Sequence, residues 1–210
     1  RGSTFPIRKV ISSRFEGGSI MEIDYAQLEF RTAVFLAQDK QGMKDIQNGV
    51  DVHQYTADII GCSRQEAKPH TFKPLYGGMS GTENEKKYYS AFLKKYPDIK
   101  VWHEKLQDEA IRTKVVTLPT GRQYAFPKAE RMPWGGASSS TQIKNYPVQG
   151  FATADIVPLA CINIQELLEE HNTKSLLINT VHDSIVADVF PGEESLVASC
   201  LNKGCLGVIQ

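Results

Sequence analysis

The stretch 63–78 constrains this chain more than any other, because it combines helix signals with a regular pattern of charges and aromatic rings. It reads S-R-Q-E-A-K-P-H-T-F-K-P-L-Y-G-G. Ser63 and Glu66 form a capping-box pattern, which predicts a helix that begins at the next residue. Two cations and two aromatic residues then recur every four positions, at Arg64, Lys68, Phe72 and Tyr76.

Side chains at this spacing form one stripe, because four residues advance about 400° around an α-helix. Cationic side chains bind phosphate oxygens and aromatic rings stack on bases, so the stripe suits a ligand with a polyphosphate and a flat ring. An amphipathic helix with a solvated basic edge and a buried aromatic edge is the alternative interpretation. Pro69 and Pro74 each remove a backbone donor, so we expect a bent helix that ends at Gly77 and Gly78.

Composition narrows the class of protein. The 210 residues are 41% hydrophobic and 23% charged, which allows a sizeable core. Lys plus Arg (24) balances Asp plus Glu (24), so any nucleic-acid contact has to come from a local basic surface. The four cysteines lack metal-binding spacing, and we find no uncharged apolar run of about 18 residues and no signal-peptide core. The sequence predicts a soluble, cytoplasmic protein without a membrane partner.

Two predicted β elements each end near an aspartate. Alternating apolar residues predict a strand over 19–25 that ends near Asp24, and two apolar runs within 175–189 predict a hairpin with Asp183 in its turn. A central sheet would bring the carboxylates together, although 183 − 24 = 159 residues separate them. Close carboxylates repel without cations, so the pair implies divalent metal, most naturally Mg²⁺. The ordinary alternatives are a helix N-cap with Gln27 for the first aspartate and a turn residue for the second.

Periodicity and turn residues predict the remaining elements. Helices are expected at 27–36, 83–96, 99–114, over about 20 residues from Asn145 with a kink at Pro158, and after Pro191. A hairpin is expected at 115–126, and turn-rich or loop segments at 38–49 and 131–141.

Five motifs together resemble the family A DNA polymerases, of the bacterial polymerase I type. R-x-x-x-K-x-x-x-F-x-x-x-Y-G is similar to the family's nucleotide-binding helix, and I-D-Y-A-Q-L-E-F-R is similar to its first catalytic motif. D-x-H-x-x-T-A, N-x-P-x-Q-G-x-A-x-D and V-H-D complete the set in the family's order, and the likeness extends from Arg8 to Val189. The segment T-F-K-P-L-Y-G-G is more similar to the bacteriophage members of the family.

The resemblance implies a role for each matched residue. Asp24, Asp183 and the Tyr25 carbonyl would be ligands of two Mg²⁺ ions, and Lys68 would donate a proton in catalysis. Nucleotide contacts are implied for Gln27, Glu29, His53, Arg64, Lys68, Phe72 and Tyr76. Among these, Glu29 is the steric gate that selects deoxynucleotides, and Phe72 implies discrimination against dideoxynucleotides. DNA contacts are implied for Arg8, Asn145, Gln149 and His182.

Two positions depart from the family's pattern. Ser184 stands where the family's V-H-D-E motif has glutamate, which predicts weaker support for the site rather than its loss. Thr141 stands where the family commonly has an arginine four residues before Asn145, so one DNA contact is in doubt. Lys144 is the substitute that the sequence offers for that arginine.

The resemblance implies an α+β fold. An antiparallel-sheet palm (1–40 and 142–210) carries the two aspartates, a mostly helical fingers subdomain (41–141) is inserted in it, and thumb and exonuclease domains are expected to be absent. The implied function is a DNA-directed DNA polymerase core that works on primer–template DNA and deoxynucleoside triphosphates in a bacterial cell or phage-infected host. Replisome proteins would bind through the missing regions. The alternatives are a non-catalytic primer–template-binding fragment and a single-subunit RNA polymerase relative, against which Glu29 argues.

Overall fold

The computed structural model describes residues 10–133 and 135–208, and the chain divides into two compact units. One, the sheet unit, comprises Arg1–Ala26 and Ala152–Gln210. The other, the helical unit, is the intervening segment Gln27–Phe151. The fold is α+β with small antiparallel sheets. The limits proposed for palm and fingers, at 40/41 and 141/142, stay predictions.

The sheet unit is built on three antiparallel strands in the order β1-β5-β4. They are β1 (Ser19–Asp24), β4 (Leu176–Val181) and β5 (Ser184–Val189), close to the strands predicted from alternation. The central strand β5 is buried at five of its six positions. Because β1 and β4 both pair with β5, their ends are fixed by the register of a single strand.

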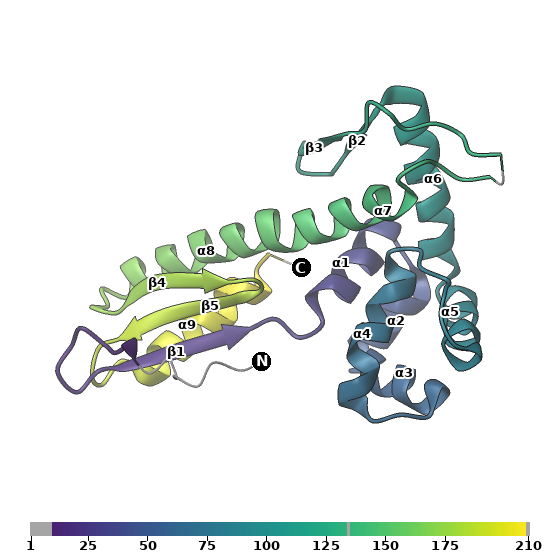
Figure 1. Ribbon diagram of the computed structural model, residues 1–210. Helices are drawn as coiled ribbons and strands as arrows, with labels where there is room; N and C mark the ends of the chain where they lie inside the picture. The colour runs from purple at the N-terminus through teal and green to yellow at the C-terminus, as the bar shows by residue number, and fades with distance from the viewer. Residues whose placement is uncertain (1–9, 134, 209–210) are drawn as a thin grey trace. The chain divides into compact units, whose positions relative to one another are not determined.

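Two helices, α8 (Val157–Glu170) and α9 (Glu194–Leu206), pack against each other beside this sheet (Figure 1). Their close approach requires a glycine, since a Cβ on Gly204 would lie 2.9 Å from the backbone nitrogen of Ile164. Buried residues of α9, among them Val197 and Leu201, complete the apolar side of the unit.

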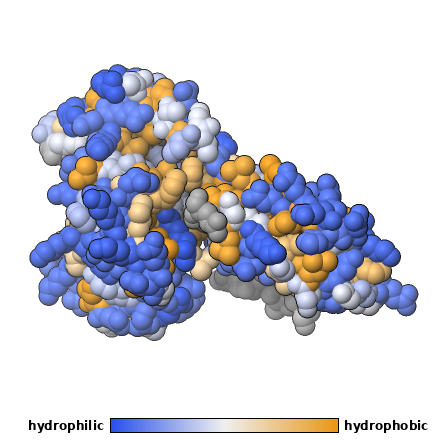
Figure 2. All heavy atoms as spheres, turned by 180° about the vertical axis from the view of Figure 1, so that it is seen from behind, coloured by the Kyte–Doolittle hydropathy of each residue, from blue (hydrophilic) through white to orange (hydrophobic). Residues whose placement is uncertain are grey.

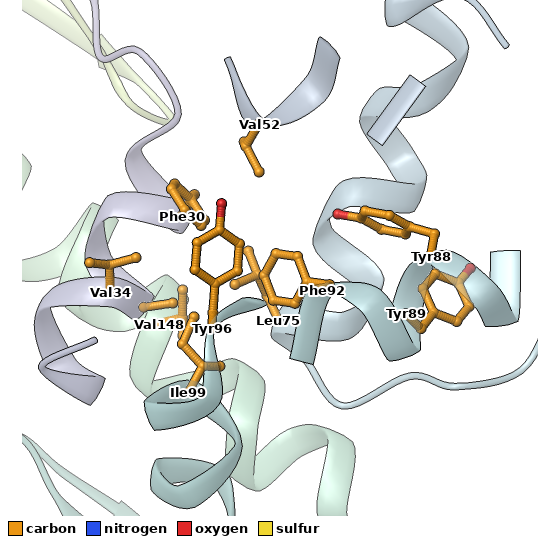
Figure 3. Packing of buried hydrophobic residues seen from close by; sticks show 11 residues of the cluster. Phe30, Val34, Val52, Leu75, Tyr88, Tyr89, Phe92, Tyr96, Ile99 and Val148 are labelled. Carbon is orange, nitrogen blue, oxygen red and sulfur yellow. The ribbon is translucent and has the colours of Figure 1, made fainter. Parts of the chain in front are cut away.

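The helical unit contains seven helices among its described residues. They are α1 (Leu28–Ala37), α2 (Lys40–Gln47), α3 (Val52–Ile60), α4 (Arg64–Leu75), α5 (Glu83–Lys95), α6 (Pro97–Thr113) and α7 (Ser140–Gln149). Their shared core is rich in aromatic rings, and Figure 3 shows Phe92 of α5 and Tyr96 of the α5–α6 junction near Leu75 of α4. Phe92 and Tyr96 lie edge to face with ring centroids 4.9 Å apart. Helix α4 is therefore anchored by its buried face.

The predicted hairpin at 115–126 is confirmed as β2 (Val115–Thr117) and β3 (Gln123–Ala125). Its apolar side chains pack with those of α6 and α7 in a second small core. Helix α2, by contrast, occupies a segment for which turns were predicted. Asp39 caps it by accepting a hydrogen bond from the Gly42 amide at 2.7 Å, and Asp45 binds the Tyr96 hydroxyl at 2.8 Å. The cap at Asp39 is a local signal, and the contact between Asp45 and Tyr96 adds stabilisation from a partner 51 residues away.

The helical run expected from Asn145 begins earlier, at Ser140, and continues to Glu170. Its middle, Gly150–Ile156, is a π-helix, and Pro158 follows in the first turn of α8, where a missing backbone donor is tolerated. The local change of helical register therefore lies just before the proline at which a kink was predicted.

By length and composition the run Ser140–Glu170 could also cross a membrane, the one such helix in the described part of the chain. The core helix of a water-soluble protein passes the same test, so this is weak support for a membrane span. On the visible faces of both units, hydrophilic side chains predominate and apolar ones are scattered among them (Figure 2).

Candidate functional site

In the sheet unit, strand pairing brings the two predicted aspartates to the same end of the sheet. Asp24, the last residue of β1, lies opposite Ser184, the first residue of β5. The next amide, that of Tyr25, donates a hydrogen bond to the Asp183 carbonyl at 3.3 Å. Asp24 is exposed and Asp183 is half-buried, so solvent reaches both residues.

The hairpin turn that carries Asp183 has two residues, His182 and Asp183, between the paired residues Val181 and Ser184. His182 is exposed with φ 56°, a left-handed conformation that histidine tolerates better than most residues. The turn thus places the predicted primer contact next to the predicted metal ligand.

The helix N-cap considered for Asp24 is wrong. Helix α1 begins at Leu28, and its N-cap is Gln27, in a left-handed conformation (φ 57°) with no side-chain capping hydrogen bond. Asp24 is the last residue of β1 instead, three residues earlier. The capping role therefore does not account for this aspartate.

A third carboxylate that the sequence did not single out lies at this end of the sheet. Ser184 donates from Oγ to the Glu22 carboxylate at 2.7 Å, and the same Oγ lies 3.1 Å from the Val181 carbonyl. Glu22 and Asp24 are two residues apart on one strand, so they share a face. The alternation of residues 19–25 already predicted this face, but the serine contact spans 162 residues.

Replacing Ser184 by the family's usual glutamate is expected to destabilise the metal-free chain by about 1 kcal/mol. The new carboxylate would lie opposite Asp24 and next to Glu22, and like charges at such positions repel. Urea unfolding without divalent metal measures the loss, and Glu22→Gln in the same chain should recover most of it. Equal stability of Ser184→Glu and the parent would contradict the predicted repulsion.

The oxygen ligands at this end of the sheet fit Mg²⁺. Among residues 10–133 and 135–208, no group of three or more His, Cys, Asp or Glu could hold a metal by itself. Mg²⁺ usually binds one or two carboxylates and completes its shell with water and substrate phosphates. Asp24 and Asp183 supply that donor set.

In the helical unit, the predicted capping box of α4 is confirmed. Ser63 accepts from the Glu66 amide at 3.3 Å, and the Glu66 carboxylate accepts from the Ser63 amide at 3.0 Å. At the other end the Gly77 amide donates to the Pro74 carbonyl and the Gly78 amide to the Lys73 carbonyl, which is a Schellman ending.

A glycine suits this ending. Gly77 has φ +73°, a conformation that strains other residues, and an added Cβ would displace the Lys144 amine. His103 of α6 hydrogen-bonds the last carbonyl of α4, that of Leu75, at 2.8 Å. Burial, with the nearby Lys144 charge, lowers the pKa of His103 to about 3. The neutral ring therefore donates its Nε2 proton to that carbonyl.

The first half of the α4 stripe meets the N-terminus of α3. Arg64 Nε lies 2.6 Å from Asp51, which caps α3 by accepting from the His53 and Gln54 amides. The His53 ring is buried and lies edge to face against Phe72 at 5.4 Å between centroids. Burial and then the positive charges of Arg64 and Lys68 lower the pKa of His53, against the opposing charge of Asp51. Three basic side chains thus gather around one acidic one, which suits an anionic ligand.

The second half of the stripe ends at Tyr76, the C-cap of α4. Its buried hydroxyl faces Glu29 of α1 and Gln149 of α7, and among the described residues it has no partner with full hydrogen-bond geometry. Burial, followed by the charge of Glu29, raises the pKa of Tyr76, so the phenol stays protonated. The predicted steric gate and base-contact residues are therefore neighbours.

Apart from Arg8, the predicted DNA contacts lie on α7 and in the turn between β4 and β5. Arg8 lies outside the described residues, and Thr141 is exposed on α7. Asn145 is half-buried, and its Oδ1 has no hydrogen-bond partner in the described part of the chain. Lys144 is half-buried, and burial lowers its pKa. Its amine lies at Gly77, at the C-terminal end of α4.

The chain is similar to known proteins along most of its length. The family model for DNA polymerase family A matches residues 2–205. DNA polymerase I of Lactococcus lactis subsp. cremoris is 31% identical over 196 residues, which cover 83% of this chain and 22% of that protein. Thermostable DNA polymerase I of Thermus aquaticus is 27% identical over an alignment of 224 residues, gaps included, that covers 94% of this chain and 26% of that protein.

A solved structure shares the fold. The POL domain of Pol1 from M. smegmatis, in complex with DNA primer–template and dNTP, superposes with a TM-score of 0.79 at 20% sequence identity. The match covers 93% of this chain and 38% of that one.

Together these findings define a polymerase domain of the polymerase I type. The chain belongs to DNA polymerase family A, whose members use divalent metal ions. It spans about a quarter of the length of the curated relatives it matches. These relatives are bacterial, so they give no support to the expected closer likeness to bacteriophage members.

Proposed function

We propose that this chain is the nucleotidyl-transfer core of a template-directed DNA polymerase. It adds deoxynucleotides to the 3′-hydroxyl of a primer that is paired with a template, in the cytoplasm. The observation that carries the proposal is the register of β1 and β5, which places Asp24 and Asp183 at one end of the same strand pair. The M. smegmatis domain, with primer–template and dNTP, supports this choice of partners.

Asp24, Asp183 and the Tyr25 carbonyl would hold two Mg²⁺ ions. When bound, such a pair activates the primer 3′-hydroxyl and stabilises charge on the leaving pyrophosphate. The carboxylates fix the position of the reacting groups because they sit on a paired strand end and a two-residue turn. Glu22, held by Ser184, adds negative charge beside them.

The α4 stripe binds the incoming nucleotide. Arg64, Lys68 and His53 bind the triphosphate, and Lys68 donates a proton to the leaving pyrophosphate. Phe72 packs against the sugar. Glu29 crowds a ribose 2′-hydroxyl and so selects deoxynucleotides, while Gln27 contacts the same nucleotide.

The remaining contacts go to the duplex and the templating base. Tyr76 lies near the templating base, and its buried hydroxyl keeps it next to Glu29. Asn145 and Gln149 reach the minor groove of the primer–template. His182 and Arg8 contact the primer end.

Primer extension by the 210-residue chain with Mg²⁺ and dNTPs tests the proposal. We expect extension that stops with EDTA, that is far weaker with rNTPs, and that falls by at least about a thousandfold in Asp183→Asn. Asp58→Asn, an exposed aspartate on α3, is the matched control and should retain activity.

The other outcomes identify the alternatives. Duplex binding without extension by the parent chain would favour a non-catalytic primer–template-binding fragment. Extension with rNTPs in preference to dNTPs would favour an RNA polymerase relative. Extension that survives Asp183→Asn would refute the assigned metal site.

A further inference from the structure

Two buried threonine hydroxyls lie behind the His53 imidazole, between α3 and α4. Thr71 Oγ1 lies 3.1 Å from His53 Nδ1, 2.8 Å from Thr56 Oγ1 and 3.1 Å from the Ala67 carbonyl. Thr56 Oγ1 in turn donates to the Val52 carbonyl at 2.7 Å. Thr56 and Thr71 are fully buried and His53 is 6% exposed, so they satisfy their hydrogen bonds with one another.

The direction of these hydrogen bonds follows from a count of protons once Thr56 donates to Val52. Each hydroxyl has one proton, and a carbonyl can only accept. The Thr56 proton is used on the Val52 carbonyl, so the short Thr56–Thr71 contact needs the Thr71 proton. If Thr71 donates instead to the Ala67 carbonyl, its proton is likewise not available to His53. With the Thr56 proton on the Val52 carbonyl, only the imidazole can supply the proton between Nδ1 and Thr71.

We infer that Thr71, backed by Thr56, holds His53 in the tautomer with its proton on Nδ1, so that His53 binds a triphosphate only when Nε2 takes up a second proton. A neutral imidazole in this tautomer presents the Nε2 lone pair, which phosphate oxygens repel. The imidazolium presents an N–H donor instead. The ligand in this inference is the nucleotide of the proposed function, on which this part rests.

The charges around His53 favour proton uptake only when the ligand is bound. The described charged groups that face it are Asp51 at the start of its own helix, and Arg64 and Lys68 on α4. On α5, Tyr88 faces the two threonines, and burial raises the pKa of this tyrosine, so it adds no charge. In the free protein, burial and the two cations lower the pKa of His53 and keep the ring neutral near pH 7. A triphosphate reverses the sign of the local charge, which favours the imidazolium.

The tautomer can be read directly in the free, ¹⁵N-labelled 210-residue chain. Long-range ¹H–¹⁵N spectra at pH 7.5 should show His53 with a protonated Nδ1 and an unprotonated Nε2. Thr71→Val keeps the shape but removes the hydroxyl, and is expected to give a mixture of tautomers. Thr71→Ser should restore the parent spectrum. Thr32→Val is the matched control, because Thr32 is buried and its hydroxyl lacks a partner among the described residues.

Calorimetry measures the proton uptake. The parent chain and His53→Gln are each titrated with dTTP and Mg²⁺ in two buffers of different ionisation enthalpy. Proton uptake in His53→Gln measures the contribution of the nucleotide's own phosphates. The parent chain should take up as much as about one proton more. In primer extension, Thr71→Val should raise KM for dTTP by about five- to tenfold, change kcat less, and alter the pH dependence of KM. A merely structural threonine would leave that pH dependence unchanged.

The possible results separate this inference from the proposed function. A proton on Nε2 in the free parent chain, or uptake equal to that of His53→Gln, overturns the inference and leaves the polymerase proposal intact. A protonated Nδ1 without dTTP binding supports the tautomer, but refutes both the ligand and the proposed function.

Discussion

Lys68→Met is expected to slow primer extension by about a hundred- to a thousandfold, the typical effect of removing one electrostatic contact to a transition state. Lys68 lies one helical turn after Arg64 on α4, and its positive charge reaches the His53 ring. Methionine keeps the length and apolar character of the side chain but cannot neutralise the triphosphate or donate a proton. Steady-state extension of a primed template, with the melting temperature measured in parallel, checks the prediction.

The same helix supplies the control. Lys73→Met makes the same change five residues further on, where the lysine amine lies 5.4 Å from the centre of the Tyr89 ring, away from His53. This variant should extend primers at close to the parent rate. The pKa of His53 should rise in Lys68→Met, because the Lys68 charge lowers it, and stay unchanged in Lys73→Met. Equal losses of activity in the two variants would show that the stripe does not face the nucleotide.

Lowering the pH from 7 to 4.5 should destabilise the parent chain by about 2.5 kcal/mol more than His103→Gln. His103 has a pKa of about 3 in the folded chain, against an ordinary value of 6.5. Below pH 6.5 the unfolded chain therefore binds a proton at this histidine that the folded chain does not bind. The free energy of unfolding falls as the pH falls toward 3. Glutamine does not titrate, and its amide can donate to the Leu75 carbonyl in place of the ring.

Urea unfolding of both chains at the two pH values measures this difference. Carboxylates also titrate in this range, but they do so in both chains and cancel in the comparison. His171→Gln replaces an exposed histidine beyond α8 and serves as the control for loss of a surface imidazole. Parallel pH profiles of the parent and His103→Gln would contradict a neutral, buried His103.

The elements that the sequence predicted well are those with local causes. The start of α4 follows from Ser63 and Glu66, and its end from Gly77. The four-residue repeat of the stripe and the alternation in β1 are periodic over fewer than 15 residues. Caps, turns and periodic patterns involve residues only a few positions apart, so they can be predicted from the sequence alone. The roles of the matched residues, by contrast, came from the resemblance to the family.

The contacts that complete the candidate site have causes far away in the chain. Helix α2, which forms where turns were predicted, is stabilised by the hydrogen bond from the Tyr96 hydroxyl to Asp45. The Glu22 carboxylate meets Ser184 only through the register of β1 and β5. Neither contact leaves a periodic trace in the sequence.

By itself, the sequence determined the family, the capped helix α4 with its stripe of cations and rings, and the two strand ends that carry aspartates. The tertiary structure alone decided which side chains surround them: the serine opposite Asp24, the histidine that caps α4 and the threonines behind His53. The physical reason is the range of the interactions. Helix caps and strand alternation depend on neighbours in sequence, whereas cross-strand register and buried hydrogen bonds depend on how distant segments pack.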